Sequence, residues 1–244
     1  MRPLSAQEVI EVWEAGENQH LVDRALTLLV AACPEQTRDE LAALSVGRRD
    51  ASLLTLRART FGPRLKSFIE CPRCSERLEF ELAVSDLLVV DPEVLEAEYE
   101  LLAGDLRMHF RLPDSRDLAA LLDCRDVEAA YEMLVQRCVQ RATSDGSPVD
   151  CSELPAEAIT KLAGRMAECD PQADVLLDLR CLECDHEWRA PFDIAVFFWS
   201  ELASRARRLL DEVHSLALAY GWREGDILSM SARRRKHYLE MVGA

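Results

Sequence analysis

The 244-residue sequence lacks any long apolar run, any secretion signal and the common catalytic motifs. No segment approaches the roughly 20 apolar residues of a membrane-spanning helix, so we expect no membrane insertion. The N-terminus has no basic-then-apolar pattern, because glutamates interrupt it, and we expect a protein that is made and kept in the cytoplasm. The motifs G-x-x-x-x-G-K-S/T, G-x-G-x-x-G, G-x-S-x-G and H-E-x-x-H are absent, and five histidines are scattered singly. We therefore expect no enzymatic activity.

Basic residues are also scarce, with 29 lysines and arginines against 44 aspartates and glutamates and a net charge of −15. Nucleic-acid binding depends on neutralising phosphates with Lys and Arg, so this composition argues against a nucleic-acid partner. The one dense basic cluster is Arg233–Lys236. It either contacts an acidic partner or complements the acidic body of the same chain.

Cysteine, in contrast, is plentiful, and four of the nine cysteines form two C-x-x-C pairs: Cys71 with Cys74, and Cys181 with Cys184. A shift of 110 residues superposes the two pairs and aligns the apolar residues around them, with Ile69 on Leu179, Leu78 on Trp188, Leu82 on Phe192 and Val84 on Ile194. Apolar residues at even spacing around a tight turn are typical of a β-hairpin. A structural zinc ion takes four ligands, so we predict that both hairpins share one Zn²⁺ bound by all four cysteines.

Other interpretations of these pairs remain open. A C-x-x-C motif also serves as a redox dithiol, but that motif works alone at the start of a helix. Disulfides are rare in cytosolic proteins. His186 could replace one cysteine as a ligand, although an exposed strand histidine is the simpler interpretation. The nearby arginines could compensate the charge of four thiolates or be ordinary surface residues; they are Arg73, Arg77, Arg180 and Arg189.

Helical patterns fill the N-terminal part of the chain, and capping residues mark several starts. Ser5 with Glu8 and Thr37 with Glu40 form capping boxes, and the predicted helices span 5–15, 21–32, 37–44 and 50–61. The longest predicted helix follows Asp193 and ends at Gly221. A second apolar strip on this helix contains Val196, Phe197 and Trp199. This strip either contacts a partner or is buried because the helix packs on two sides, and we favour burial on two sides. A last helix, opened by Ser231, carries the basic cluster.

Between the cysteine pairs the pattern predicts one hairpin and three helices. The hairpin pairs 98–102 with 106–112 and places Met108 and Phe110 on one face. The helices span 114–122, 126–141 and 155–167, the second with a buried stripe of Val127, Ala130, Tyr131, Leu134 and Cys138. Residues 86–91 are predicted as a connector ending at Pro92, and 143–148 as a loop.

The predicted fold is therefore α+β and mostly helical, with a zinc-ribbon-like pair of β-hairpins. We divide the chain into an N-terminal helical part (1–62), a zinc-binding β unit (63–90 with 172–192), an inserted hairpin and helical subdomain (91–171), and a long C-terminal helix with a basic final helix (193–244).

Several short segments resemble one protein family. They are Arg49-Asp50 with Leu53-Leu54, Phe61-Gly62-Pro63, the pair at 71–74, Gly221 to Leu228, and Arg233 to Tyr238. Together they resemble the T-even-type phage baseplate proteins, which have relatives in phage-tail-like contractile injection systems. The resemblance covers about 47–90 and the C-terminal third. It implies a role in building the baseplate or central hub of a contractile tail, with baseplate or hub subunits as partners and no catalytic residues.

Three classes of function follow from these patterns. The first is a structural or assembly protein whose aromatic and leucine surface on the first helices and the long helix, together with the basic final helix, docks baseplate subunits. The second is a zinc-ribbon regulator that binds nucleic acid or a protein through Arg233–Lys236. The third is an enzyme that uses a free thiol such as Cys151; the other cysteines outside the pairs are Cys33, Cys124, Cys138 and Cys169. We favour the first class.

Overall fold

The computed structural model describes residues 1–89, 98–122 and 124–243. Four helices form the N-terminal part of the fold. Both predicted capping boxes are present, Ser5 with Glu8 and Thr37 with Glu40. The fourth helix begins earlier than predicted, because the Ser45 hydroxyl accepts a hydrogen bond from the Arg48 N–H and caps it. The helices are α1 (Ala6–Gly16), α2 (Leu21–Ala32), α3 (Arg38–Ala42) and α4 (Val46–Phe61).

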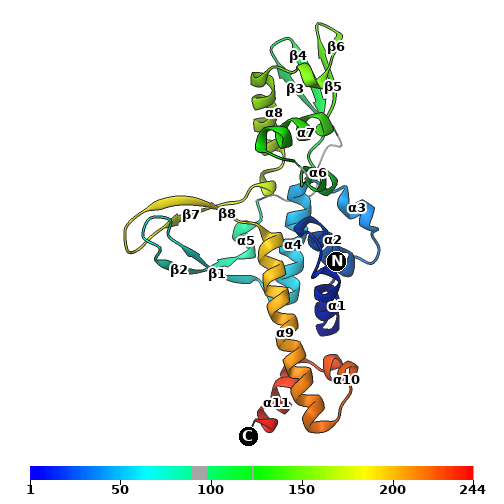
Figure 1. Ribbon diagram of the computed structural model, residues 1–244, viewed down its shortest axis with the longest axis vertical. Helices are drawn as coiled ribbons and strands as arrows, with labels where there is room; N and C mark the ends of the chain where they lie inside the picture. The colour runs from blue at the N-terminus through cyan, green and yellow to red at the C-terminus, as the bar shows by residue number, and fades with distance from the viewer. Residues whose placement is uncertain (90–97, 123, 244) are drawn as a thin grey trace.

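Helix α9 (Ile194–Tyr220) is the axis of the molecule and packs against α1, α2 and α4 (Figure 1). Its start and end are as predicted: Asp193 caps it, and Gly221 ends it at a φ of 67°. Leucines of α2 and α4 pack with Phe198 and Leu202 in one apolar core. Burying each such side chain contributes about 1.5–3 kcal/mol, so these contacts dominate the stability of this part. Leu28 and Leu29 on α2, and Leu53 and Leu54 on α4, are fully buried, so these leucines are not part of a docking surface on the first helices.

The second apolar strip of α9 is mostly used inside the molecule. Trp199 is buried and lies over the C-terminal end of α1, where Gly16 leaves room for the indole ring. The Arg24 guanidinium lies 4.6 Å from the Trp199 ring centre. Phe197 is partly buried against the core, whereas Val196 is exposed. The interpretation that α9 is buried on two sides is thus correct for Trp199 and only partly so for Phe197.

Two antiparallel β-hairpins leave the helical part on the same side and extend together as two arms (Figure 1). The first arm pairs β1 (Arg64–Glu70) with β2 (Arg77–Ala83), and the second pairs β7 (Leu176–Arg180) with β8 (Glu187–Pro191). Helix α5 (Val84–Leu87) follows the first arm. The sequence predicted a connector from residue 86, so α5 includes the start of that segment. The end of the predicted connector, at 90–92, lies outside the described residues.

A four-stranded antiparallel sheet with three helices lies between the arms in sequence and at the opposite end of the molecule from the C-terminus (Figure 1). Met108 and Phe110 are buried in its separate apolar cluster, as predicted. The strands are β3 (Tyr99–Ala103), β4 (Leu106–Phe110), β5 (Val139–Ser144) and β6 (Ser147–Val149). The helices are α6 (Ser115–Leu121), α7 (Val127–Cys138) and α8 (Ala156–Cys169), with single 3₁₀ turns at Cys151–Glu153 and Pro171–Ala173.

This region corrects three predictions. Helix α7 ends at Cys138, because the following residues pair with β4 as strand β5 instead of continuing the helix. The segment 143–148, predicted as a loop, is the tip of a second hairpin, whose turn residues Asp145 and Gly146 both have positive φ. The predicted buried stripe of α7 is correct for Cys138 but wrong for Val127 and Tyr131, which are exposed, and it omitted Val135, which is buried.

The C-terminal end adds two short helices to α9. Helix α11 (Ala232–Val242) is capped by Ser231 as predicted, whereas α10 (Glu224–Ser229) was not predicted. The fold is thus α+β with small antiparallel sheets and is 56% helical, in agreement with the predicted class.

Candidate metal centre

The tips of the two arms have the same backbone structure. In the first arm the Cys71 N–H donates to the Glu76 carbonyl, and the Ser75 N–H donates to the Cys71 carbonyl. In the second arm the Cys181 N–H donates to the His186 carbonyl, and the Asp185 N–H donates to the Cys181 carbonyl. Ser75 and Asp185 occupy the left-handed region, with φ values of 61° and 53°. The 110-residue repeat of the sequence therefore corresponds to a repeated turn that directs two thiols in one direction.

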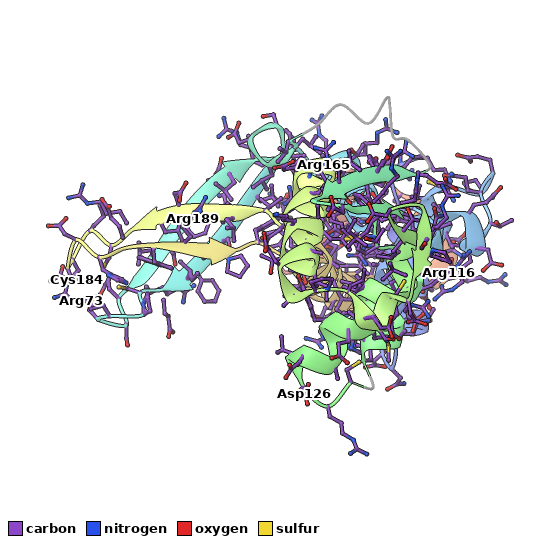
Figure 2. All side chains as sticks on the ribbon, turned by 90° about the horizontal axis from the view of Figure 1, so that it is seen from above. Arg73, Arg116, Asp126, Arg165, Cys184 and Arg189 are labelled. Carbon is purple, nitrogen blue, oxygen red and sulfur yellow. The ribbon has the colours of Figure 1, made fainter. Side chains whose placement is uncertain are left out.

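These turns bring four sulfur atoms together at the far end of the arms, where Figure 2 shows Cys184 beside Arg73 of the other arm. The Sγ atoms of Cys71 and Cys184 are 3.7 Å apart, and those of Cys74 and Cys181 are 3.6 Å apart. All four Sγ atoms lie within 4.8 Å of one another. A tetrahedral zinc ion with Zn–S bonds of about 2.3 Å requires sulfur–sulfur distances of about 3.8 Å. The donor set and its spacing therefore fit a metal ion with four thiolate ligands.

The electrostatics of the four thiols also fit a cation at their centre. Burial opposes ionisation of Cys71, but hydrogen bonds from the Arg73 and Cys74 N–H groups and from neighbouring thiols outweigh it and lower the pKa of Cys71 to about 7. At Cys74 the Glu76 N–H favours the thiolate, yet burial and the three neighbouring thiols prevail and raise its pKa to about 12. One thiolate thus suppresses the ionisation of its neighbours, and a divalent cation removes that repulsion.

The alternative interpretations of the cysteine pairs fit less well. A disulfide requires a sulfur–sulfur distance of about 2.05 Å, much shorter than the distances between the arms. Neither pair stands at the start of a helix, where a redox dithiol is activated. His186 stacks on Trp188, with ring centres 5.7 Å apart, and does not belong to the group of close donor atoms.

The arginines near the centre have other contacts. The Arg77 guanidinium lies 3.9 Å from the Phe68 ring centre, Arg180 pairs with Asp185, and Arg189 pairs with Asp178. These are exposed surface pairs, which each contribute little to stability. For Arg77, Arg180 and Arg189 the interpretation as ordinary surface residues is therefore favoured over charge compensation at the four thiols.

Comparison with protein families gives a match over most of the chain. The family described as T4 bacteriophage base plate protein matches residues 1–199. The chain belongs to this family. Neither the curated proteins nor the solved structures gave a match.

In this base plate protein the matched residues include both arms and all four clustered cysteines. They also include the segments around Arg49 and Phe61 that suggested the family from sequence. The match ends within α9, so the C-terminal segments that resembled the family, Gly221 to Leu228 and Arg233 to Tyr238, lie outside it. The family match thus covers the N-terminal and middle parts of the chain, including residues outside the 47–90 region that suggested the family from sequence.

A buried arginine, which the sequence did not indicate, fixes the base of the first arm of the base plate protein. The Arg57 guanidinium donates two hydrogen bonds of 2.7 Å to the Glu201 carboxylate on α9. It also donates to the carbonyls of Gly62 and Arg64, where α4 leads into β1. One side chain therefore holds α4, α9 and β1 in a fixed relation, and bidentate pairing makes this contact specific. Because Arg57 and Glu201 are 144 positions apart, no local sequence pattern reveals their pairing.

The basic cluster of the base plate protein is smaller than its sequence suggests. Arg235 is buried, where its Nε–H donates to Glu212 and its Nη1–H to the Met230 carbonyl. Three exposed cations remain, which are Arg233, Arg234 and Lys236. Arg235 thus holds α11 against α9, and the cluster is a weaker candidate for phosphate binding than four adjacent cations would be.

Three cysteines outside the arms have thiols with a shifted pKa, and none of the three is an activated nucleophile. Burial raises the pKa of the Cys33, Cys138 and Cys151 thiols, which lowers the fraction of thiolate at neutral pH.

In the part of the chain that the structure describes, no helix combines the length and the apolar character needed to cross a membrane.

Proposed function

We propose that this protein is a non-enzymatic structural or assembly protein of the baseplate or hub of a contractile tail or related injection system. The family match over residues 1–199 is the observation that carries this proposal. The centre at the arm tips supports it, because four cysteine ligands close a zinc coordination sphere, whereas a catalytic site keeps one position for water or substrate. Baseplate or hub subunits are its partners.

We further propose that Zn²⁺ is the bound metal and that Cys71, Cys74, Cys181 and Cys184 are its ligands. Four thiolates favour zinc over hard cations such as Mg²⁺ and Ca²⁺. A structural zinc contributes folding free energy, because its ligands are brought together only in the folded chain. Here it joins two two-stranded arms, each of which would be only marginally stable alone.

The proposed division of the chain follows the same logic. Separate apolar clusters in the helical part and in the β3–β6 region support an inserted subdomain at 91–171 between the two halves of the zinc-binding unit, 63–90 and 172–192. The parts at 1–62 and 193–244 build the helical body that carries the arms. The zinc ion then holds together the two ends of the insertion.

The arm tips are a suitable contact surface. Leu182, between the second pair of cysteines, is 91% exposed, and Figure 2 shows the tips standing away from the rest of the molecule. A rigid projecting tip loses little conformational entropy on docking, so the arm tips are suited to contact a neighbouring subunit.

Deletion of the gene in the organism that encodes it tests the proposed function. We expect electron microscopy of the deletion strain to show free tubes or incomplete tails without baseplates, and expression of the wild-type chain to restore them. Mass spectrometry of purified particles then separates a permanent subunit, which is present, from an assembly factor, which is absent. Normal, infective or contractile particles in the deletion strain would contradict the proposal.

A further inference from the structure

A groove of about 450 Å³ is lined by residues of β1 and α9, at the base of the first arm. Three phenylalanines contribute its apolar surface. Phe61 and Phe197 are partly buried against the core, while Phe68 on β1 is 56% exposed. An exposed aromatic ring beside a groove offers a large apolar area to a ligand at little cost in conformational entropy.

The edge of β1 that faces α9 is unpaired. Among the described residues β1 pairs only with β2. In an antiparallel pair alternate residues direct their backbone groups away from the partner strand. The Cys71 N–H donates a hydrogen bond toward β2, so the residues that alternate with it, Phe68 and Lys66 among them, direct their backbone groups to the opposite side. Arg64 does the same, and its carbonyl accepts a hydrogen bond from Arg57. Because Arg57 also binds Glu201, that side is the one facing α9.

The charges along the groove are positive in a chain whose net charge is −15. Lys66, Arg205 and Arg208 line it, and its acidic residue Glu201 is neutralised by Arg57. Arg205 lies 3.7 Å from Glu212, whereas Lys66 and Arg208 form no ion pair among the described residues. The groove therefore attracts an acidic segment that most of the remaining surface repels.

We propose that this groove binds an extended, acidic segment of another baseplate protein, which adds as a strand to the free edge of β1. Strand addition supplies main-chain hydrogen bonds, and alternate side chains of the segment supply specificity. Its apolar side chains contact Phe61, Phe68 and Phe197, and its carboxylates face Lys66 and Arg208. This inference rests on the proposed baseplate role and names the chemistry of the partner.

Fluorescence anisotropy with synthetic peptides tests the groove on the purified full-length chain. The probe is a labelled peptide in which aspartates alternate with phenylalanine and leucine, compared with one that carries lysine in place of aspartate. We expect the acidic peptide to bind, the basic one not to bind, and the double variant Lys66→Glu/Arg208→Glu to weaken binding by about tenfold or more. The control variant Lys161→Glu/Arg165→Glu changes the net charge by the same amount on α8 and should bind like the wild type.

Hydrogen–deuterium exchange locates the bound peptide. Amides of β1 should become protected when the acidic peptide binds, and Phe68→Ala should weaken binding while the circular dichroism spectrum stays unchanged. Equal binding of both peptides, equal loss in the control variant, no binding of the acidic peptide, or protection away from β1 would overturn the proposal. None of these results affects the gene-deletion experiment, so failure of the groove and failure of the baseplate role are distinguishable.

Discussion

The Sγ atoms of Cys71 and Cys184 lie 3.7 Å apart although 113 positions separate the two residues. Cys74 and Cys181 show the same relation at 3.6 Å. Each arm thus contributes two neighbouring sulfurs, and the intervening chain forms a closed loop that contains the whole β3–β6 region. A cross-link that closes a loop of this size stabilises the folded chain by about 4–5 kcal/mol in the chain-entropy model.

The first prediction concerns this cross-link. Cys184→Ser removes one of the four proposed ligands; if they hold a metal ion, the variant should lose it, and the free energy of unfolding should fall by about 4 kcal/mol. The control is Cys124→Ser, which removes a thiol outside the cluster and should retain both metal and stability. Urea unfolding with and without a chelator measures the effect. If the wild type and Cys184→Ser unfold at the same urea concentration and the chelator has no effect, the proposal that a metal ion cross-links the two arms is wrong.

The contact between Gly16 and Trp199 gives a second prediction. A Cβ atom at position 16 would lie 2.3 Å from the indole Cη2, so Gly16→Ala should displace the ring and destabilise the protein by about 1–3 kcal/mol. At Gly164, in the interior of α8, an added Cβ would meet no atom within 4 Å, and Gly164→Ala should stabilise by about 0.5–1 kcal/mol through helix propensity. Thermal unfolding of both variants checks the opposite signs, and equal shifts would contradict the packing described for Trp199.

Arg57 gives a third prediction. Arg57→Met leaves Glu201 and two carbonyls without their donor, so we expect a loss of about 3–5 kcal/mol and weaker protection of β1 amides in hydrogen exchange. Arg207, exposed on the same helix as Glu201, is the matched control, and Arg207→Met should change stability by less than about 0.5 kcal/mol. A small effect of Arg57→Met would show that the arm is fixed by other contacts.

A fourth prediction concerns acid sensitivity of the β3–β6 region. Burial disfavours ionised Asp117, but Arg111, the Asp114 N–H and Arg137 outweigh it and lower its pKa from 3.8 to about 2. A lowered pKa contributes stability that is present above pH 3.8 and is lost as the pH falls toward 2, here about 2 kcal/mol. Asp117→Asn should therefore be destabilised at pH 7 and differ less from the wild type near pH 3.

Urea unfolding between pH 3 and pH 7 checks this dependence. Asp105→Asn, at an exposed turn position, is the control and should follow the wild type throughout. A difference between Asp117→Asn and the wild type that stays constant over this range would mean that the two arginines do not stabilise the carboxylate.

Local patterns predicted most of the helices, because their signals are short in range. Ser5, Thr37, Asp193 and Gly221 mark helix ends through hydrogen bonds or φ values within a few residues. The repeated C-x-x-C turns predicted the sulfur cluster for a similar reason. Each turn is a local signal, and its repetition indicates that both turns contribute ligands to one metal ion. The Asp145-Gly146 dipeptide also carried a hairpin signal, which the helical pattern before it obscured.

What the sequence did not reveal depends on distant partners. Val139 to Ser144 is a strand because β4 offers an edge to pair with, and no local property of that segment requires this. The Arg57–Glu201 pair, the burial of Arg235 and the groove beside β1 likewise join residues that are far apart in sequence.

The most direct test of the shared metal centre is a measurement of metal content and ligand type on the full-length protein. Native mass spectrometry combined with X-ray absorption at the zinc edge should find one zinc ion per chain, surrounded by four sulfur atoms at about 2.3 Å. A metal-free chain, two zinc ions per chain, or a first shell with nitrogen or oxygen in place of sulfur would contradict it.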